Sequence, residues 1–254
     1  MPRRFSADPP NARARPPWDL GDRLASLGSV LALFAVVLQT GTHLINVLLF
    51  EGRWEKLNAD VELGVFSWAS SSATIAAAFA AAVLAIVTRA GLRLWALVLV
   101  LTYFSLDDAV VIHERFGDSW ATALGLPGDP LRLLWVGSLA PLLAGAFLLI
   151  WALARQSQGV IRRVLIIGLA SLVTAVLAEV VAANLVAAGW AQTVPHLLEV
   201  VVEEGAELGG WILIASGLMA RVVTVIATAP DQRSRPQLAQ GWASRRVRAA
   251  GPDG

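Results

Sequence analysis

The chain contains 254 residues, of which 56% are hydrophobic and only 15% are charged. This composition is typical of a protein that crosses a membrane several times. The formal net charge of +1 provides no general electrostatic attraction for nucleic acid, and the absence of cysteine excludes disulfides, thiolate metal sites and cysteine nucleophiles.

Six apolar stretches follow one another along the chain, and each is longer than the roughly 20 residues that a bilayer demands. They cover residues 24–50, 63–88, 92–116, 131–154, 160–189 and 197–228. The sequence therefore predicts an all-α fold, in which one domain at residues 24–228 forms a six-helix transmembrane bundle. Residues 1–23 and 229–254 are rich in proline and arginine, which predicts a disordered N-terminal tail and a disordered basic C-terminal tail.

The placement of arginine predicts which side of the membrane each connection faces. Arginines occur in the N-terminal tail and after the second, fourth and sixth stretches, whereas the other connections are acidic, mixed or neutral. Basic residues near helix ends stay on the cytoplasmic side, so both termini are expected in the cytoplasm. All but one of the 20 basic residues are arginine, a bias that we ascribe to a GC-rich bacterial genome. The expected location is therefore a bacterial inner membrane.

Charged side chains interrupt the third apolar stretch, in "TYFSLDDAVVIHERFGD" at residues 102–118. On a continuous helix Asp107 would lie about 21 Å from Arg93, which places it inside the hydrocarbon layer. Asp107 and Glu114 would project within about 20° of one another, whereas His113 would project about 120° away from Asp107. The alternative is that the helix ends early, at Asp107 and Asp108.

The sixth stretch carries a stripe of polar residues near its start. His196, Glu199, Glu203 and Glu207 fall within about 80° on one face of a helix, and Glu204 lies off this stripe. Counted from Arg221, Glu207 would lie about 21 Å up, at the same depth as Asp107, and Glu203 would lie about 27 Å up. The alternative is an amphipathic segment at residues 196–207 outside the membrane, followed by a shorter membrane helix.

Two other stretches place polar groups in the same layer. Glu179 is flanked by apolar residues on both sides and would lie about 24 Å from Arg163. On the first stretch Gln39, His43 and Asn46 share a face, and His43 is equally compatible with a hydrogen-bonded packing role and with a ligand role. Four stretches thus direct polar side chains into one layer.

Ionisable groups inside a bilayer are unfavourable by about 2.5 to 3.5 kcal/mol each at a helix centre, so a bound cation, shared protons or a water-filled cavity must compensate them. Carboxylates and imidazoles without sulfur are the ligands of zinc, iron or manganese. Calcium or magnesium is favoured only if the histidines are not ligands. No familiar histidine motif is present, so the number of metal ions stays open. The candidate metal ligands are Asp107, His113, Glu114, Glu179, His196, Glu199, Glu203 and Glu207, and the candidate catalytic acids or bases are Asp108 and Glu204.

The first functional hypothesis is a membrane-embedded metalloenzyme, a hydrolase or an oxidoreductase, that acts on a lipid-like substrate from the outer leaflet of the bilayer. The second is a transporter or channel in which the same carboxylates bind a cation or share protons. The third is a non-catalytic membrane subunit or sensor in which an ion fixes the packing of the helices. In all three the lipid bilayer is the partner, and nucleic acid is not.

Overall fold

The computed structural model describes residues 18–59, 61, 63–112, 115, 119, 134–191 and 193–229. Within these residues the fold consists of six α-helices and a short 3₁₀ helix, without a β-strand, which confirms the predicted all-α class. The two predicted tails lie outside these ranges, except for residues 18–23, which belong to the first helix, and for Ala229, which follows the last helix.

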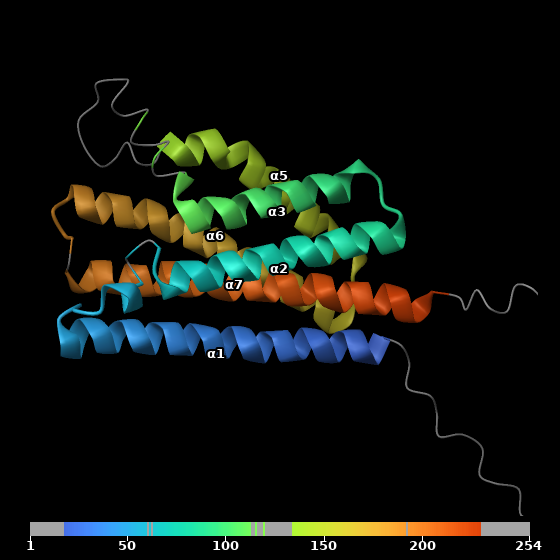
Figure 1. The fold of residues 1–254 in the computed structure, drawn as a ribbon, viewed down its shortest axis with the longest axis horizontal. Helices are drawn as coiled ribbons and strands as arrows, with labels where there is room; N and C mark the ends of the chain where they lie inside the picture. Colours follow the sequence, from blue (N-terminus) through green and yellow to red (C-terminus); the bar gives the residue numbers. More distant parts are fainter. Residues whose placement is uncertain are drawn as a thin grey trace, which may run out of the picture.

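The helices run alternately up and down the bundle, as Figure 1 shows. Their bounds are α1 Trp18–Phe50, α2 Val65–Thr88, α3 Leu92–Val110, α5 Leu134–Gln156, α6 Gly159–Ala187 and α7 Val194–Thr228, with the 3₁₀ helix η1 at Glu55–Leu57 between α1 and α2. The start of α1 and the end of α7 lie at the same end of the bundle, together with the connections α2–α3 and α5–α6 (Figure 1). We call this the arginine end. The opposite end, with the connections α1–α2 and α6–α7, is the acidic end.

Five of the described helices are long and apolar enough to cross a membrane, namely α1, α2, α5, α6 and α7. The sixth predicted span, α3, has 19 residues, which makes it the shortest of the six described helices, and it carries Arg93, Asp107 and Asp108. At 1.5 Å per residue it is nevertheless about 28 Å long, close to the thickness of a hydrocarbon core.

The outer faces of the helices are apolar, as expected for surfaces that contact lipid. On α1 the side chains of Leu33, Phe34 and Leu49 are exposed by 66%, 62% and 72%. A water-soluble protein rarely exposes large contiguous apolar patches, so this surface calls for a non-aqueous environment. We therefore describe the chain as a multi-pass, membrane-type helical protein.

Helix α7 lies at the centre of the bundle and packs against α1, α2 and α6. Glycines permit this close packing, because a Cβ atom at Gly210 would lie 3.2 Å from the carbonyl oxygen of Gly168, and a Cβ at Gly168 would lie 3.1 Å from the carbonyl oxygen of Gly210. Gly205 and Gly209 of α7 face the side chain of Val36 on α1. The backbones of α6 and α7 therefore meet almost directly at the Gly168–Gly210 crossing.

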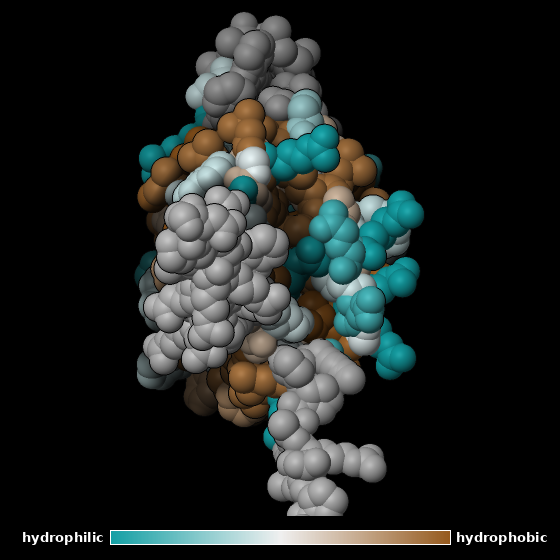
Figure 2. Space-filling view, turned by 90° about the vertical axis from the view of Figure 1, so that its right-hand side faces the viewer, coloured by the Kyte–Doolittle hydropathy of each residue, from teal (hydrophilic) through white to brown (hydrophobic). Residues whose placement is uncertain are grey.

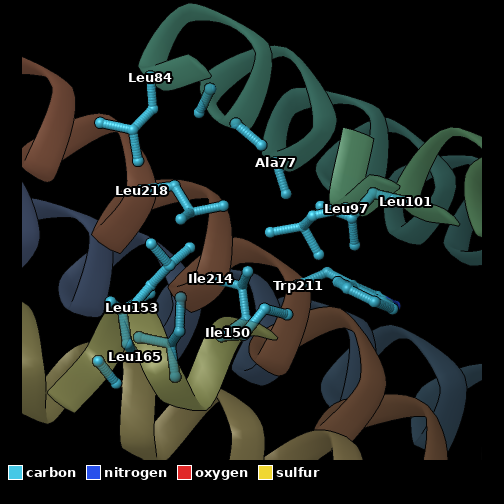
Figure 3. Close-up of a cluster of buried hydrophobic side chains, with 14 of the residues drawn as sticks. Ala77, Leu84, Leu97, Leu101, Ile150, Leu153, Leu165, Trp211, Ile214 and Leu218 are labelled. Atoms are coloured by element: carbon cyan, nitrogen blue, oxygen red, sulfur yellow. The ribbon is translucent and has the colours of Figure 1, made fainter. Parts of the chain in front are cut away.

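A cluster of leucine, isoleucine and alanine side chains fills the bundle between its middle and the arginine end (Figure 3). It joins α2, α3, α5, α6 and α7 through fully or almost fully buried side chains: Leu84, Leu97, Leu101, Ile150, Leu165, Ile214 and Leu218. On α7 these residues come after Trp211, toward the arginine end. This half of the bundle is therefore packed with apolar side chains.

Helix α3 ends earlier than the sequence predicts. Its last residue is Val110, and Val111 adopts a left-handed conformation with φ 58° while its N–H donates to the carbonyl oxygen of Asp107 at 2.7 Å. A β-branched residue rarely adopts this conformation, so the sequence does not mark the helix end. The predicted span to residue 116 is therefore too long, and the predicted angular pairing of Asp107 with Glu114 stays a prediction. Glu114 and His113 themselves lie outside the described residues.

Helix α7, in contrast, is a single helix from Val194 to Thr228. Residues 196–207 and 208–228 therefore belong to one continuous helix. At 1.5 Å per residue the 35-residue helix is about 52 Å long, so it exceeds the thickness of a hydrocarbon core.

Hydrophilic side chains gather at the arginine end, which faces the viewer in Figure 2. They include the exposed side chains of Arg23, Arg89, Arg93, Arg155, Arg162 and Arg163. Arg221 of α7 is different, because it turns toward the last turn of α5. Its Nη1 donates to the carbonyl oxygen of Leu153 and to the hydroxyl of Ser157, both at 2.8 Å, and its Nη2 donates to Oε1 of Gln156 at 2.9 Å. The positive guanidinium thus caps the negative end of the α5 helix dipole.

Replacing Arg221 with alanine is expected to lower the free energy of unfolding by about 2 kcal/mol, because hydrogen bonds made by a charged group are lost. The measurement is the midpoint of thermal unfolding of the purified protein. Arg162→Ala, which removes an exposed arginine at the same end, is the matched control and should leave the midpoint nearly unchanged. Equal losses in the two variants would contradict the capping role.

Candidate functional site: an acidic cavity inside the bundle

A cavity of about 130 Å³ lies within the bundle on the acidic-end side of the apolar core. Its polar wall is formed by α2, α3, α6 and α7, and its apolar wall by α3, α5, α6 and α7. Six carboxyl side chains line it: Asp107, Asp108, Glu179, Glu203, Glu204 and Glu207. No lysine, arginine or histidine is among the described residues that line it. A volume of this size holds several water molecules or a small organic ion.

Helix α7 supplies three of these carboxyl groups through its helical periodicity. Glu203 and Glu207 are four residues apart and lie one above the other on the same face. Glu204 is rotated by about 100° from Glu203, which turns it toward α1. There Nε2 of Gln39 donates to Oε2 of Glu204 at 3.3 Å. Glu204 therefore faces both the cavity and the α1–α7 contact.

Glu203 interacts with two other carboxyl groups, those of Glu179 on α6 and of Glu199 one turn earlier on α7. Glu199 is only 7% exposed. Because an ionised carboxylate can only accept hydrogen bonds, carboxyl groups that lie so close together are stabilised by a shared proton or by a cation. The group formed by Glu179, Glu199 and Glu203 is the most concentrated acidic part of the site.

A hydrogen bond to α2 indicates how far the cavity lies from the acidic end of the bundle. The hydroxyl of Ser70 donates to Oε1 of Glu207 at 2.7 Å. Ser70 lies about 8 Å inside the start of α2 at Val65, when counted along the helix axis. The carboxyl group of Glu207 is therefore below the end of a membrane-type helix and not on a loop.

A pair of serines fixes α3 against α2 beside the cavity. The hydroxyl of Ser71 donates to the carbonyl oxygen of Ser105 at 2.6 Å, and the hydroxyl of Ser105 donates to the carbonyl oxygen of Ser71 at 2.9 Å. Both serines are buried. This reciprocal contact sets the rotation of α3 and thereby holds Asp107, which is 7% exposed, toward the bundle interior.

The cavity is also lined by apolar and aromatic side chains. Phe104 of α3 and Trp211 of α7 lie with their ring centroids 6.3 Å apart and their planes tilted by 45°. The remaining apolar lining comes from α5 and α6: Leu139, Leu143, Phe147, Leu172, Ala175 and Val176. The cavity thus has an acidic wall and an apolar wall.

A second pocket lies at the acidic end between α1, the α1–α2 connection and the start of α7, and it contains His43 and His196. The backbone N–H of Ala59 donates to Nδ1 of His43 at 3.0 Å, which assigns the ring hydrogen of the neutral imidazole to Nε2. Asn46 accepts from the N–H of Trp54 and donates to its carbonyl oxygen, both at 3.1 Å. His43 and Asn46 therefore hold the α1–α2 connection, and the hydrogen-bonded packing role applies to His43.

The predicted metal ligands do not converge as a whole. Within the ranges that the structure describes, no three histidine, aspartate or glutamate side chains are placed to hold one metal ion. Asp107, Glu179, Glu203 and Glu207 line the cavity together with the two candidate acids or bases, Asp108 and Glu204. Glu199 lies beside Glu203, and His196 lies in the second pocket. His113 and Glu114 lie outside the described residues.

The sequence reasoning missed the partners of these carboxyl groups. Ser67 and Ser70 line the cavity, although the serine- and alanine-rich stretch of α2 is typical of simple close packing. Phe104 and Trp211 were not singled out either. The spacing of Ser67, Ser70, Ser71 and Thr74, which puts four hydroxyl groups on one face of α2, was the available signal.

These observations define a helical, membrane-type protein with an acidic cavity inside its bundle. The chain belongs to the family described as a domain of unknown function, DUF8692, whose family model matches residues 30–222. The matched region contains every residue that lines the cavity. No curated protein and no solved structure matches the chain.

Proposed function

We propose that the protein is a membrane cation-binding protein in which the acidic cavity exchanges protons for a cation, as the binding step of a proton-coupled transporter. The observation that carries this proposal is that six carboxyl side chains from α3, α6 and α7 surround one cavity within the bundle. Ionisable groups inside a bilayer are unfavourable unless they are compensated, and they mark ion and proton sites.

The proposal also predicts from which side of the membrane a cation reaches the cavity. We treat α3 as the sixth membrane span and place the arginine end in the cytoplasm of a bacterial cell, following the positive-inside rule. The apolar core then closes the cavity toward the cytoplasm, and the polar residues of α7 continue from the cavity toward the outer face through Glu203, Glu199 and His196. Cations and protons would therefore enter from outside in this conformation.

The test is isothermal titration calorimetry of the purified full-length protein with sodium, calcium, manganese and alkylammonium ions. Each titration is repeated in two buffers of different ionisation enthalpy at the same pH. Cation binding that displaces protons gives a heat that differs between the buffers, and this is the expected result for at least one cation. Absence of binding for every cation, or identical heats in both buffers, would overturn proton–cation exchange.

A metal-dependent enzyme that acts on a lipid-like substrate is the second candidate. It is favoured by the apolar wall of the cavity, which could hold a hydrocarbon chain beside the carboxyl groups. To bind zinc, iron or manganese, the ligand side chains would have to lie closer together than they do among the described residues. Elemental analysis of the purified protein separates the two candidates, since this enzyme requires about one or two bound transition metal ions per chain.

A further inference from the structure

The two walls of the acidic cavity restrict the kind of cation that it can bind. A small inorganic cation needs several oxygen ligands that converge on one point at short distance. The described part of the chain offers no group of three acidic or histidine side chains with that placement. Six carboxyl groups that surround a volume of about 130 Å³ are instead suited to a larger ion whose charge is neutralised without close coordination.

The hydrogen-bonding groups around the cavity are mostly acceptors. Carboxylates accept only, and the donors on the described lining are the hydroxyls of Ser67 and Ser70 and the indole N–H of Trp211. A ligand that carries several N–H groups complements a lining whose polar groups are mostly acceptors.

The apolar wall requires a second property of the ligand. Phe104, Phe147 and Trp211 offer aromatic surface, and α5 and α6 add aliphatic side chains. Aromatic faces attract cations electrostatically, most strongly when water is excluded. Apolar surface of the ligand gains free energy when it is buried against such a wall. A bare ammonium ion or a metal ion would leave this wall without a partner.

We infer that the ligand of the acidic cavity is a protonated organic amine with a small apolar or aromatic group. This inference rests on the proposed cation-binding function and names its ligand class. The ammonium group donates hydrogen bonds to the carboxylates of α3, α6 and α7, while the apolar group lies against Phe104, Phe147 and Trp211. No bond is made or broken, and the positive charge of the amine replaces the protons that the carboxyl groups release.

The test compares four probes by calorimetry on the full-length protein: benzylammonium, methylammonium, benzyl alcohol and calcium. Benzylammonium should bind at least about tenfold more tightly than methylammonium. The apolar surface that its ring buries is expected to increase the affinity by at least about this factor. Benzyl alcohol, which has the ring without the charge, should not bind measurably. Similar affinities for benzylammonium and benzyl alcohol would overturn the inference, since the carboxyl groups would then play no part.

Two matched variants test the placement of the apolar group. Phe147→Ala should weaken benzylammonium binding about tenfold while leaving methylammonium binding nearly unchanged. Phe79→Ala removes the same side chain from an exposed position on α2, where Phe79 is 64% exposed, and should change neither affinity. Equal effects of Phe147→Ala on both amines would overturn the assignment of the apolar wall.

The outcomes separate the inference from the proposed function. If calcium binds with proton release and the amines do not, proton–cation exchange stands and the amine ligand is excluded. If neither these probes nor sodium and manganese bind to a protein that unfolds cooperatively on heating, both are excluded.

Discussion

Replacement of Glu203 with glutamine is expected to lower the affinity for a cation at least about tenfold and to remove most of the accompanying proton release. Glu203 is the member of the acidic cluster that interacts with carboxyl groups on both sides, Glu179 of α6 and Glu199 of α7. Glutamine keeps the size and shape of the side chain but cannot release a proton. The measurement is titration calorimetry in two buffers of different ionisation enthalpy, with the cation that binds best to the unchanged protein.

The same variant should not be less stable than the parent protein. Removal of one of three adjoining carboxyl groups removes electrostatic repulsion in the proposed binding site, and such changes commonly stabilise a protein by about 0.5 to 2 kcal/mol. Thermal unfolding without added cation should therefore show an equal or higher midpoint. A structural role for Glu203 predicts the opposite, a lower midpoint, because its hydrogen bonds would then hold α6 and α7 together.

Glu55→Gln is the control for these measurements. Glu55 begins the 3₁₀ helix at the acidic end and is exposed, so the substitution removes a carboxyl group from the same end of the bundle without touching the cavity. Cation affinity, proton release and the unfolding midpoint should all stay near the parent values. If Glu55→Gln and Glu203→Gln weaken binding equally, the general negative charge of the acidic end attracts the cation, and the cavity is not the site.

The positions of the α7 carboxyl groups relative to one another could be predicted from the sequence, because residues four apart on a helix share a face. Glu179 could be placed at the same depth, because its distance from Arg163 follows from helical rise alone. Both arguments depend only on continuity of one helix. The structure places Glu179, Glu203 and Glu207 on one cavity, where the two helices meet.

The remaining parts of the site depend on features that helical periodicity does not encode. Helix α3 ends at Val110 through a left-handed Val111, a residue type that does not signal a helix end, so the early end of the helix could not be predicted. The contact between Ser70 and Glu207 depends on how far α2 is shifted along α7, which is a property of two packed helices. His196 lies about 10 Å along α7 from Glu203, and this distance puts it in the second pocket.

A Gly210→Ala substitution should destabilise the protein by about 1 to 3 kcal/mol, because the added methyl group overpacks the crossing of α6 and α7. A Cβ atom at this position would lie 2.8 Å from Cδ2 of Leu172 and 3.2 Å from the carbonyl oxygen of Gly168. The leucine side chain can rotate, but the carbonyl oxygen belongs to the backbone of α6 and can move only with the helix. The substitution should therefore separate α6 from α7 immediately beside the cavity, which Leu172 and Trp211 line.

Gly145→Ala on α5 provides a control of opposite sign. A Cβ atom at Gly145 would have no neighbour within 4 Å, so the substitution causes no overpacking. Only its effect on the conformational freedom of the backbone remains. Alanine in the middle of a helix is more favourable than glycine by about 0.5 to 1 kcal/mol, and this variant should unfold at the same or a higher temperature. Because both variants add one methyl group to a helical glycine, the difference between their midpoints measures the α6–α7 contact itself. If Gly210→Ala unfolded at or above the temperature of Gly145→Ala, the two helices would not be in backbone contact at Gly168 and Gly210.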